Sequence, residues 1–371
     1  MILFLVDMPK PTHGMSSINQ QMWRLCQQQA IELQLINTVP SFAAALFHTR
    51  WWFVIKCLYS LLVFFRLGWC LLFNKPAVVY RSINGGVGQF FDLFFLLLLR
   101  LSRSQVVLHH HSFSYLNRQS SLFRCVLSLL KPTDRHLVLG LPMANRLEQL
   151  YAVPARNVHV LSNLSFFSKA PNTQASPGGM PQVVTLGHLA NLSFDKGLRT
   201  FVDVAVLLQQ SGVKVQANLA GPYSSADVAA YVSLQTKQYP FIRSIGPVYG
   251  EDKQQFFAAL DLFVFPSKYV NEAEPLVLFE AAQHGALLAG TDRGCMASQI
   301  NMFGGFCFAE DIAAVDVAQQ IKQLISSGLL ASECKISRRS SFAVAQEQAQ
   351  LRLQQIIGFF RAGYVPESSA V

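Results

Sequence analysis

The stretch DLFVFPSKYVNEAEPLVLFEAAQHGALLAGTDRG, residues 261–294, constrains the fold more than any other part of the chain. Asp261–Phe265 is a short apolar run, rich in Val and Phe, that ends at a Pro-Ser pair, so it predicts a buried parallel strand. Pro275 favours the first turn of a helix, and Gly285 is the expected C′ residue after its last turn. Ala286–Ala289 follows as a second apolar strand. Strand, loop, helix and strand in this order predict part of a parallel α/β sheet.

Two carboxylates lie where such a sheet binds its ligands. Open α/β sheets bind ligands at the carboxyl ends of their strands, where helix N-termini present unpaired N–H groups to anions. Glu272 falls in the loop, and Glu280 falls in the helix. Like charges repel, so neither carboxylate can be a phosphate ligand. Both can accept hydrogen bonds from sugar hydroxyls while the helix start, at Leu276 and Val277, holds phosphates. The pattern predicts a nucleotide-sugar site, with a solvated Glu and a surface ion pair as the alternative.

The match extends beyond the two glutamates. Apolar strand, Pro-Ser, Glu-x7-Glu-Ala, Gly, apolar strand and Thr-Asp-x-Gly follow one another in an order that resembles the donor-site signature of GT-B-fold glycosyltransferases of family 4. The resemblance implies two Rossmann-like doubly wound α/β domains facing across a cleft. It implies that Glu272 contacts the transferred sugar and Glu280 the ribose hydroxyls. It departs from the family at Ala273-Glu274, because relatives have an aromatic-Gly pair soon after the first Glu.

The C-terminal half offers a second group of donor-binding residues. A strand from Val183 is followed by Gly187-His188 and by Lys196-Gly197 at the start of a helix. A lysine beside free helix N–H groups can pair with a diphosphate, although a solvated loop lysine is the alternative. The resemblance implies that Lys196 contacts phosphate. Many relatives carry Arg where this chain has His188, so we expect weaker or pH-dependent neutralisation of phosphate charge there.

The start of the N-terminal half offers a possible phosphate- or sugar-binding loop. Met1–Val6 predicts a strand, and the loop after it contains Gly14. We expect a helix from Ser16 or Ser17, so that strand, glycine-bearing loop and helix start could cradle phosphate or sugar. A tight turn is the alternative explanation for Gly14. The position matches the glycine loop that family members aim at the donor.

A run of three histidines follows another predicted strand, Gln105–Leu108. Strand alternation places His109 and His111 on one face. The alternatives are a structural histidine or a metal site, but two histidines without a nearby carboxylate make a poor zinc site, and we expect no metal. In related glycosyltransferases a histidine at a strand end reaches the donor sugar and phosphate. The resemblance assigns that catalytic role, together with Glu272, to His111, with His109 as the second choice.

The net charge of +9 is concentrated in the first half. Residues 1–165 carry 15 Lys and Arg against 5 Asp and Glu, whereas residues 166–371 carry 15 against 16. Such asymmetry indicates an anionic partner, either nucleic acid or a membrane surface, and the Leu and aromatic residues of the same half favour the membrane. The odd number of cysteines, 7, without a Cys-x-x-Cys pair, favours a reduced compartment. The start of the chain lacks the basic region of a signal peptide. We therefore expect a cytoplasmic protein, peripheral on the inner face of the membrane.

The most apolar region, Phe47–Phe73, contains three tryptophans. Cys57–Phe73 approaches the length of a membrane span, but Arg66 lies inside it, and an arginine in mid-membrane costs about 2.5–3.5 kcal/mol. Basic residues spread through the segment favour an interfacial helix. A buried pair of core helices and a spanning helix are the alternatives.

Together these features predict four parts of the chain. Residues 1–166 form an acceptor-binding, membrane-associating domain, 167–182 a linker, 183–345 a nucleotide-sugar-binding domain, and 346–371 a helix that crosses back, with a tail. We expect transfer of a sugar, with retention and without a cofactor, from a nucleoside-diphosphate sugar to a saccharide acceptor. The basic, aromatic first half favours a lipid-linked acceptor of envelope polysaccharide synthesis.

Three other functions are open. A nucleotide-sugar 2-epimerase has the same type of fold, and it would act without an acceptor. A non-catalytic, membrane-associated sugar-binding protein would have the same surfaces but no turnover. A nucleic-acid-binding protein would explain the charge but not the two glutamates, so we expect no nucleic-acid partner.

Overall fold

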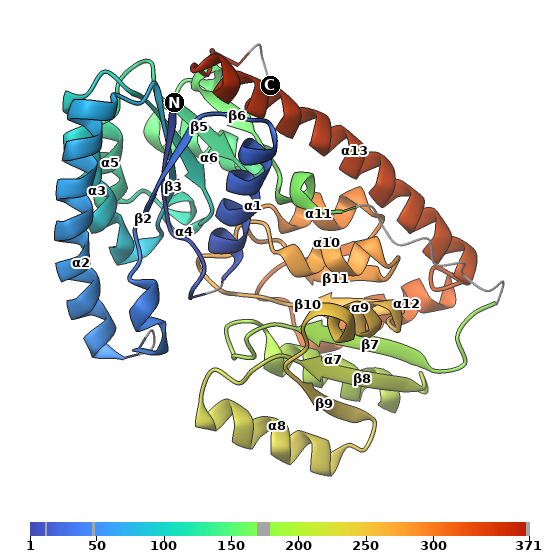
Figure 1. Ribbon diagram of the computed structural model, residues 1–371. Coiled ribbons are helices and arrows are strands. Elements are labelled where there is room, and N and C mark those ends of the chain that lie inside the picture. The colour runs from blue at the N-terminus through green and yellow to red at the C-terminus, as the bar shows by residue number, and fades with distance from the viewer. Residues whose placement is uncertain (12, 47–48, 169–178, 369–371) are drawn as a thin grey trace. The chain divides into compact units, whose positions relative to one another are not determined.

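The computed structural model describes residues 1–11, 13–46, 49–168 and 179–368, and the chain divides into two compact units. Met1–Phe167 and Gln348–Val371 form the N-terminal unit, and Ser168–Glu347 form the C-terminal unit. Residues 169–178 of the predicted linker, Phe47, and the end of the predicted tail, 369–371, lie outside the described residues. Within the described ranges each unit is built on a parallel sheet of six strands flanked by helices (Figure 1). The predicted fold of two Rossmann-like α/β domains is therefore confirmed.

The sheet of the N-terminal unit has the strand order β2-β1-β3-β4-β5-β6, and its pairings are parallel. After β2 the chain crosses over β1 to form β3, so the topological switch point lies between β1 and β3. Ligands of such sheets bind at the carboxyl ends of the strands on either side of this point. The strands are β1 (Ile2–Val6), β2 (Leu33–Asn37), β3 (Val78–Ile83), β4 (Gln105–His110), β5 (Arg135–Val138) and β6 (Val158–Val160).

Helices lie in the connections between the strands of this unit. The first one begins earlier than expected, at Gly14 rather than at Ser16 or Ser17, because the side chain of His13 accepts a hydrogen bond from the Ser16 N–H and caps the helix. The helices are α1 (Gly14–Gln28), α2 (Arg50–Trp69), α3 (Gln89–Leu101), α4 (Ser114–Asn117), α5 (Ser121–Ser128) and α6 (Leu141–Tyr151). Shorter turns of helix are η1 (Ser41–Leu46), η2 (Cys70–Asn74), η3 (Gly86–Gly88), η4 (Ala155–Asn157) and η5 (Asn163–Phe166).

The end of the chain completes the N-terminal core. The long helix α13 (Ser332–Ala362) begins in the C-terminal unit, and its last turns belong to the N-terminal unit. There Ile356 and Phe360 are buried in one cluster with Ile2 and Phe4 of β1. Beyond the helix, the Gln105 side chain accepts a hydrogen bond from the Val365 N–H and donates one to the Val365 carbonyl. Residues at opposite ends of the sequence thus share one core.

The sheet of the C-terminal unit has the order β12-β11-β10-β7-β8-β9. Its switch point lies between β7 and β10, which pair in parallel. The strands are β7 (Val184–Leu189), β8 (Val215–Ala220), β9 (Ile242–Gly246), β10 (Leu262–Phe265), β11 (Leu287–Thr291) and β12 (Phe306–Phe308). The helices are α7 (Leu198–Gln210), α8 (Ala226–Gln238), α9 (Gly250–Ala258), α10 (Leu276–Gln283), α11 (Met296–Met302) and α12 (Ala314–Ser326).

The predicted strand–loop–helix–strand unit is confirmed as β10, α10 and β11. Burial of the two apolar strands on both faces explains their continuous runs of apolar residues. Gly285 follows α10 with φ of 80°, and a β-carbon there would lie 2.5 Å from the Lys335 carbonyl oxygen. Glycine is therefore required after the last turn, as the sequence indicated.

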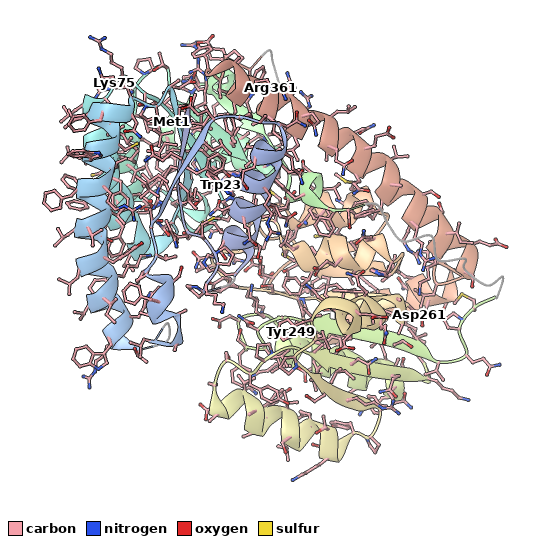
Figure 2. All side chains as sticks on the ribbon, in the orientation of Figure 1. Met1, Trp23, Lys75, Tyr249, Asp261 and Arg361 are labelled. Carbon is pink, nitrogen blue, oxygen red and sulfur yellow. The ribbon has the colours of Figure 1, made fainter. Side chains whose placement is uncertain are left out.

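The apolar region of the first half forms helix α2 and its continuation η2. Among the described residues this helix, Arg50–Asn74, is the one long and apolar enough to cross a membrane by length and composition, and 22% of its most apolar window is buried. The alternative of a buried pair of core helices does not fit most of its surface, since large apolar side chains such as Phe65 are exposed. Figure 2 shows side chains projecting from the outer side of this helix, with Lys75 at its end.

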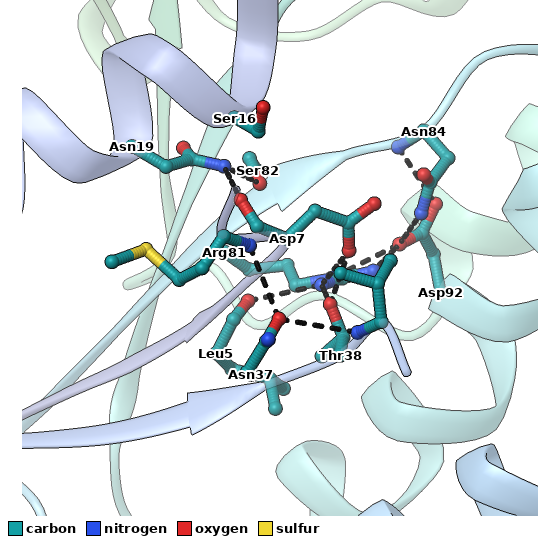
Figure 3. Close-up of polar contacts among 12 residues, drawn as sticks. Leu5, Asp7, Ser16, Asn19, Asn37, Thr38, Arg81, Ser82, Asn84 and Asp92 are labelled. Carbon is teal, nitrogen blue, oxygen red and sulfur yellow. Dashed lines mark hydrogen bonds and ion pairs between the residues drawn. The ribbon is translucent and has the colours of Figure 1, made fainter. Parts of the chain in front are cut away.

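A buried ion pair ties the strand ends of the N-terminal unit together (Figure 3). Arg81 of β3 is 1% exposed, and its Nη2 lies 2.5 Å from Oδ1 of Asp92 on α3. Arg81 also donates to the Leu5 carbonyl of β1 at 3.0 Å and to the Thr38 hydroxyl at 3.1 Å. Burial raises the pKa of Asp92, and the Arg81 charge and hydrogen bonds lower it in part. The Asp92 carboxylate also accepts a hydrogen bond from the Asn84 N–H at 3.0 Å, and this bond fixes the loop after β3.

Breaking this pair on one side should destabilise the protein strongly. Arg81→Met leaves the Asp92 carboxylate buried without its cation, which should cost about 3–5 kcal/mol of unfolding free energy. Asp92→Asn removes the other charge. The double variant should lose less than the sum of the two single losses by at least about 1 kcal/mol, because it buries no isolated charge. Urea unfolding of the four proteins measures this, and additive losses would contradict a direct interaction.

Candidate functional site

Loops from two strands meet at the switch point of the C-terminal unit. The loop after β7 carries Asp195 and Lys196, and the loop after β10 runs from Pro266 to Pro275. The Lys268 N–H donates to the Asp195 carbonyl at 2.7 Å, which joins the two loops. The site predicted from sequence therefore lies where the fold brings strand ends together.

Close packing of these loops requires glycine after Lys196. Gly197 has φ of 83°, and a β-carbon there would lie 2.1 Å from the Pro266 carbonyl oxygen. Real β-carbons do not approach an oxygen so closely, so only glycine lets the β7 loop contact the β10 loop. The Lys-Gly pair that resembled a phosphate contact thus also has a structural role, which is to let helix α7 begin against Pro266.

A third loop, after β11, supports the loop that carries Glu272. The Cys295 N–H donates to the Ala273 carbonyl at 2.7 Å, and the Thr291 hydroxyl donates to the Ser267 carbonyl at 2.6 Å. Gly294 has φ of 59°, and a β-carbon there would lie 2.6 Å from the Glu272 carbonyl oxygen. The backbone around Glu272 is therefore held from both sides by neighbouring strand ends.

Lys196 and Glu272 contact each other directly. The Lys196 Nζ lies 2.5 Å from Oε2 of Glu272, and the Ser267 hydroxyl donates to the same oxygen at 3.1 Å. The lysine also lies 4.4 Å from the ring centroid of Tyr269, in a cation–π contact. The sequence placed these two residues in one site but with different ligands, phosphate for the lysine and sugar for the glutamate. In the structure each neutralises the other.

The second glutamate is paired in the same way. Oε1 of Glu280 lies 2.5 Å from Nζ of Lys253 on α9, and its Oε2 is buried without a hydrogen-bond partner in the described part of the chain. A buried carboxylate oxygen left free in this way is available to a donor such as a ribose hydroxyl. Helix α10, which carries Glu280, starts at Leu276 and Val277 with no side-chain cap hydrogen bond. Its first N–H groups remain suited to an anion.

His188 lies inside the unit and not on its surface. It is fully buried beside the rings of Phe201 and Phe265, with centroids 5.3 and 5.7 Å away. Burial lowers its pKa to about 4, although the hydrogen bond to the Val264 carbonyl raises it in part. The side chain is therefore neutral at pH 7 and supplies no charge to a phosphate. Since the carbonyl only accepts, Nδ1 carries the proton, and the buried Nε2 is left as an acceptor.

In the N-terminal unit Gly14 is the first residue of α1, beyond the end of β1. It is exposed, and a β-carbon built on it would meet no atom within 4 Å. Gly14 is not among the residues with positive φ, so its backbone conformation does not itself require glycine. Its backbone faces open space, as a ligand contact through the main chain requires. Its role in donor binding stays a prediction.

The three histidines divide between two environments. The rings of His109 and His111 lie 4.0 Å apart, so the two share a face as expected, whereas His110 bonds to Tyr115 and His136 on the other side. Burial lowers the pKa of His111 to about 3, with a smaller contribution from His13. The Nε2 atoms of His109 and His111 are buried without a hydrogen-bond partner among the described residues. His109 is otherwise bonded to Tyr80 at 2.5 Å, so His111 is the better placed to bind a ligand.

Several site residues escaped the sequence analysis. Lys253, which pairs with Glu280, lies in an ordinary amphipathic helix and gives no sequence signal of its own. In the N-terminal unit, Asn19 donates to the Asp7 carbonyl and to the Ser82 hydroxyl, both at 2.9 Å, and connects α1, β1 and β3. Asn19 stood at a helical position without a recognisable motif. Over the ranges that the structure describes, no group of three metal-binding side chains comes together.

Comparison with known families finds one match, which lies in the C-terminal unit. Residues 181–327 match the family described as Glycosyl transferases group 1. This segment contains Lys196, Lys253, Glu272 and Glu280, the residues that the structure pairs at the switch point. None of the curated proteins matches the sequence of the chain.

Solved structures resemble the chain over nearly its whole length. HepE of Anabaena, in complex with UDP, has a TM-score of 0.66 at 17% identity and covers 97% of this chain and 99% of its own. A glycosyltransferase from Rickettsia africae reaches a TM-score of 0.72 at 12% identity, covering 98% of both chains. Sucrose-phosphate synthase of Thermosynechococcus elongatus reaches 0.70 at 14%, covering 97% of this chain and 99% of its own. These likenesses show the fold, which is the two-domain Rossmann-like fold of GT-B glycosyltransferases.

Two glycines of α7 allow the loop packing to be measured. Gly197 and Gly212 lie at its two ends with φ of 83° and 90°, but a β-carbon at Gly212 would meet nothing within 4 Å. Gly212→Ala should cost about 1 kcal/mol of unfolding free energy, for the backbone conformation alone. Gly197→Ala should cost at least about 1–3 kcal/mol more, because it also collides with Pro266. Urea unfolding compares the two, and equal losses would show that the loops do not need this contact.

The buried histidines predict a loss of stability in acid. His188 has a pKa of about 4 in the folded protein and about 6.5 in the unfolded chain. The unfolded chain therefore takes up the proton first, and stability present above pH 6.5 is lost as the pH falls toward 4. At pH 5 this group should contribute a loss on the order of 2 kcal/mol relative to pH 8. Urea unfolding of His188→Gln should show a correspondingly smaller loss, and an unchanged pH dependence would contradict the assignment.

Proposed function

We propose that this protein is a glycosyltransferase that moves a sugar from a nucleoside-diphosphate sugar to a saccharide acceptor. The observation that carries the proposal is the pairing of two glutamates with two lysines at the β7–β10 switch point, beside a helix start without a side-chain cap. This arrangement lies in the segment that matches glycosyl transferases group 1. In the reaction, the bond between the sugar C1 and the diphosphate oxygen breaks, and C1 bonds to an acceptor hydroxyl oxygen. The hydroxyl proton is released, and the nucleoside diphosphate leaves.

The paired side chains suggest how the donor is bound. A diphosphate carries more negative charge than one carboxylate, so it competes with Glu272 for the ammonium group of Lys196. Once released, Glu272 can accept a hydrogen bond from a hydroxyl of the transferred sugar. The free Oε2 of Glu280 accepts from the ribose, and Lys253 holds that carboxylate in place. Lys196 and the first N–H groups of α10 then stabilise the negative charge of the departing diphosphate.

Three finer points belong to the proposal. The likeness of residues 261–294 to family 4 supports retention of the anomeric configuration. Phosphate neutralisation by a lysine and a helix N-terminus supports a reaction that needs no metal ion. Gly14 and His111 are proposed as the donor contacts of the N-terminal unit, with His111 acting as a neutral hydrogen-bonding group, since its pKa is about 3.

We propose a lipid-linked saccharide as the acceptor, in envelope polysaccharide synthesis, with the protein on the inner face of the membrane. The support is the proximity of apolar helix α2 to the strand ends of its own unit. Although burial alone would raise the pKa of Asp7, the nearby charges of Lys56 on α2 and of Arg81 outweigh it and lower that pKa. Burial is the main cause that lowers the pKa of His13, and the charge of Lys56 acts in the same direction. The apolar helix therefore lies within electrostatic range of the polar strand ends where an acceptor sugar would bind.

Binding of nucleotide sugars tests the donor site. HepE has been crystallised with UDP and with UDP-glucose, so UDP-glucose is the first donor to try. It should raise the unfolding temperature of the wild type. Glu280→Gln should weaken binding roughly 10- to 100-fold, because a hydrogen bond to a charged group is worth about 1.5–3 kcal/mol. Glu272→Gln should lower turnover more than affinity. Isothermal titration and donor turnover measure the two effects.

The matched control is Glu367→Gln, which removes the same charge from the ion pair with Arg156 in the N-terminal unit. It should bind the donor like the wild type.

Turnover is measured in excess chelator, and the anomer of the product is read by NMR. Unchanged donor affinity in both site variants would refute the site, and an absolute need for added metal would refute metal independence. Epimerisation of the sugar at C2 without an acceptor would show a 2-epimerase instead.

A further inference from the structure

Helix α2 and its continuation η2 carry a continuous exposed apolar surface. Most of its members recur every three or four residues, which places them on one side of the helix. They extend over roughly 30 Å at 1.5 Å per residue. We call this surface the apolar stripe, and it consists of Trp51, Val54, Leu58, Leu61, Leu62, Phe65, Trp69 and Leu72. Phe65 is 73% exposed and Leu72 69% exposed. Soluble monomers rarely leave so long a surface of this kind uncovered.

Helix α3 widens this surface. It packs beside α2, where the rings of Phe64 and Phe94 stack at a centroid distance of 4.2 Å (Figure 1). Phe90, Leu97 and Leu101 of α3 are exposed as well. Two neighbouring helices therefore contribute apolar side chains that the described part of the unit does not bury.

The opposite side of α2 is fixed to the domain along its length. Val63 and Leu67 are fully buried. The Tyr59 hydroxyl donates to the Asn37 carbonyl at 3.3 Å. At the far end, the Cys70 thiol and the Asn74 amide both donate to Oε1 of Gln34, each at 3.0 Å. A helix that crossed a bilayer would have to give up these contacts with β2 and leave a row of core residues uncovered. The stripe is therefore presented sideways, along the helix.

The charge around the stripe has a single sign. Between Glu32 and Asp134 the sequence contains one acidic residue, Asp92, and it is buried against Arg81. The exposed cations beside the stripe are Arg50, Arg66, Lys75, Arg100 and Arg103. Two copies of such a face would repel each other, which disfavours a dimer through it. An anionic lipid surface is complementary to this face, because its acyl chains can take up the apolar side chains and its headgroups carry negative charge.

We propose that the apolar stripe lies flat in the headgroup region of an anionic membrane leaflet, with α2 parallel to the membrane plane. Trp51, Phe65 and Trp69 enter the boundary between headgroups and acyl chains, and the flanking arginines and Lys75 contact lipid phosphates. The proposal extends the proposed function by giving the surface that would hold a lipid-linked acceptor. Vesicle binding needs no turnover, so the two can fail separately.

Flotation of the full chain with vesicles tests the surface. The wild type should float with phosphatidylcholine vesicles that contain phosphatidylglycerol, and less with phosphatidylcholine alone. Phe65→Glu with Trp69→Glu should lower the bound fraction at least tenfold, because two carboxylates face anionic lipid. The matched control is Leu234→Glu with Leu351→Glu, which makes the same change at two exposed apolar residues outside the stripe. It should bind like the wild type.

Depth measurements test the orientation. Leu62→Trp, near the middle of α2, is placed in a background in which the four native tryptophans, Trp23, Trp51, Trp52 and Trp69, are replaced by Phe, and its fluorescence is quenched by brominated lipids. A flat helix predicts stronger quenching by bromines near the headgroups than by bromines near the chain ends. The reverse order, with resistance to alkaline carbonate, would establish a spanning helix and overturn the proposal.

Two further outcomes are decisive. No vesicle binding, together with a dimer in ultracentrifugation that Phe65→Glu with Trp69→Glu dissociates, would make the stripe a protein interface and refute the proposal. Donor binding that persists in this case would leave the proposed function intact. Equal loss of vesicle binding in the stripe variant and its control would also refute it, since the stripe would then have no special role.

Discussion

The buried ion pair between Arg81 and Asp92 is the interaction on which the N-terminal unit depends. A guanidinium group in the middle of a parallel sheet is tolerated only if its donors find acceptors, because an isolated buried charge costs several kcal/mol. Here the acceptors come from β1, from the segment after β2, and from α3. Each of these elements is therefore held in one register by the same charge. This arrangement also positions the polar strand ends near His13 and His111. Arg81 itself is too buried to contact a ligand.

In the C-terminal unit, backbone packing holds the strand-end loops in place. Three strand-end loops are joined by main-chain hydrogen bonds and by glycines that allow contacts of one loop with another. Two lysine–glutamate pairs then lie on a support that does not need the ligand to form. Each glutamate contacts a lysine, so the proposed donor would exchange one ionic partner for another. Such exchange costs less reorganisation than assembling charged groups from solvent.

The sequence predicted those parts in which local pattern and tertiary context agree. β10, α10 and β11 could be recognised because apolar runs, Pro275 and Gly285 each favour the element that forms. The start of α1 was misplaced because His13, an unusual cap, replaces the expected serine. Lys253 could not be found, since its partner Glu280 lies on another helix and only the fold brings them together. The environment of α2 was undecided for a different reason. Composition is the same for a core, interfacial or spanning helix, and only packing shows which side is covered.

The last turns of α13 and the segment after them complete the first core of the chain, and this affects how the protein is made. On the ribosome, β1 is made long before Ile356, Phe360 and Val365, which share its core. The C-terminal unit is one continuous segment, Ser168–Glu347, so it can fold before residues 348–371, which complete the N-terminal core, have been made. We therefore expect the C-terminal unit to complete its core before the N-terminal unit does, which is the reverse of the usual order of synthesis. A nascent chain therefore has Phe4 without part of its covering core until residues 356–365 have been made.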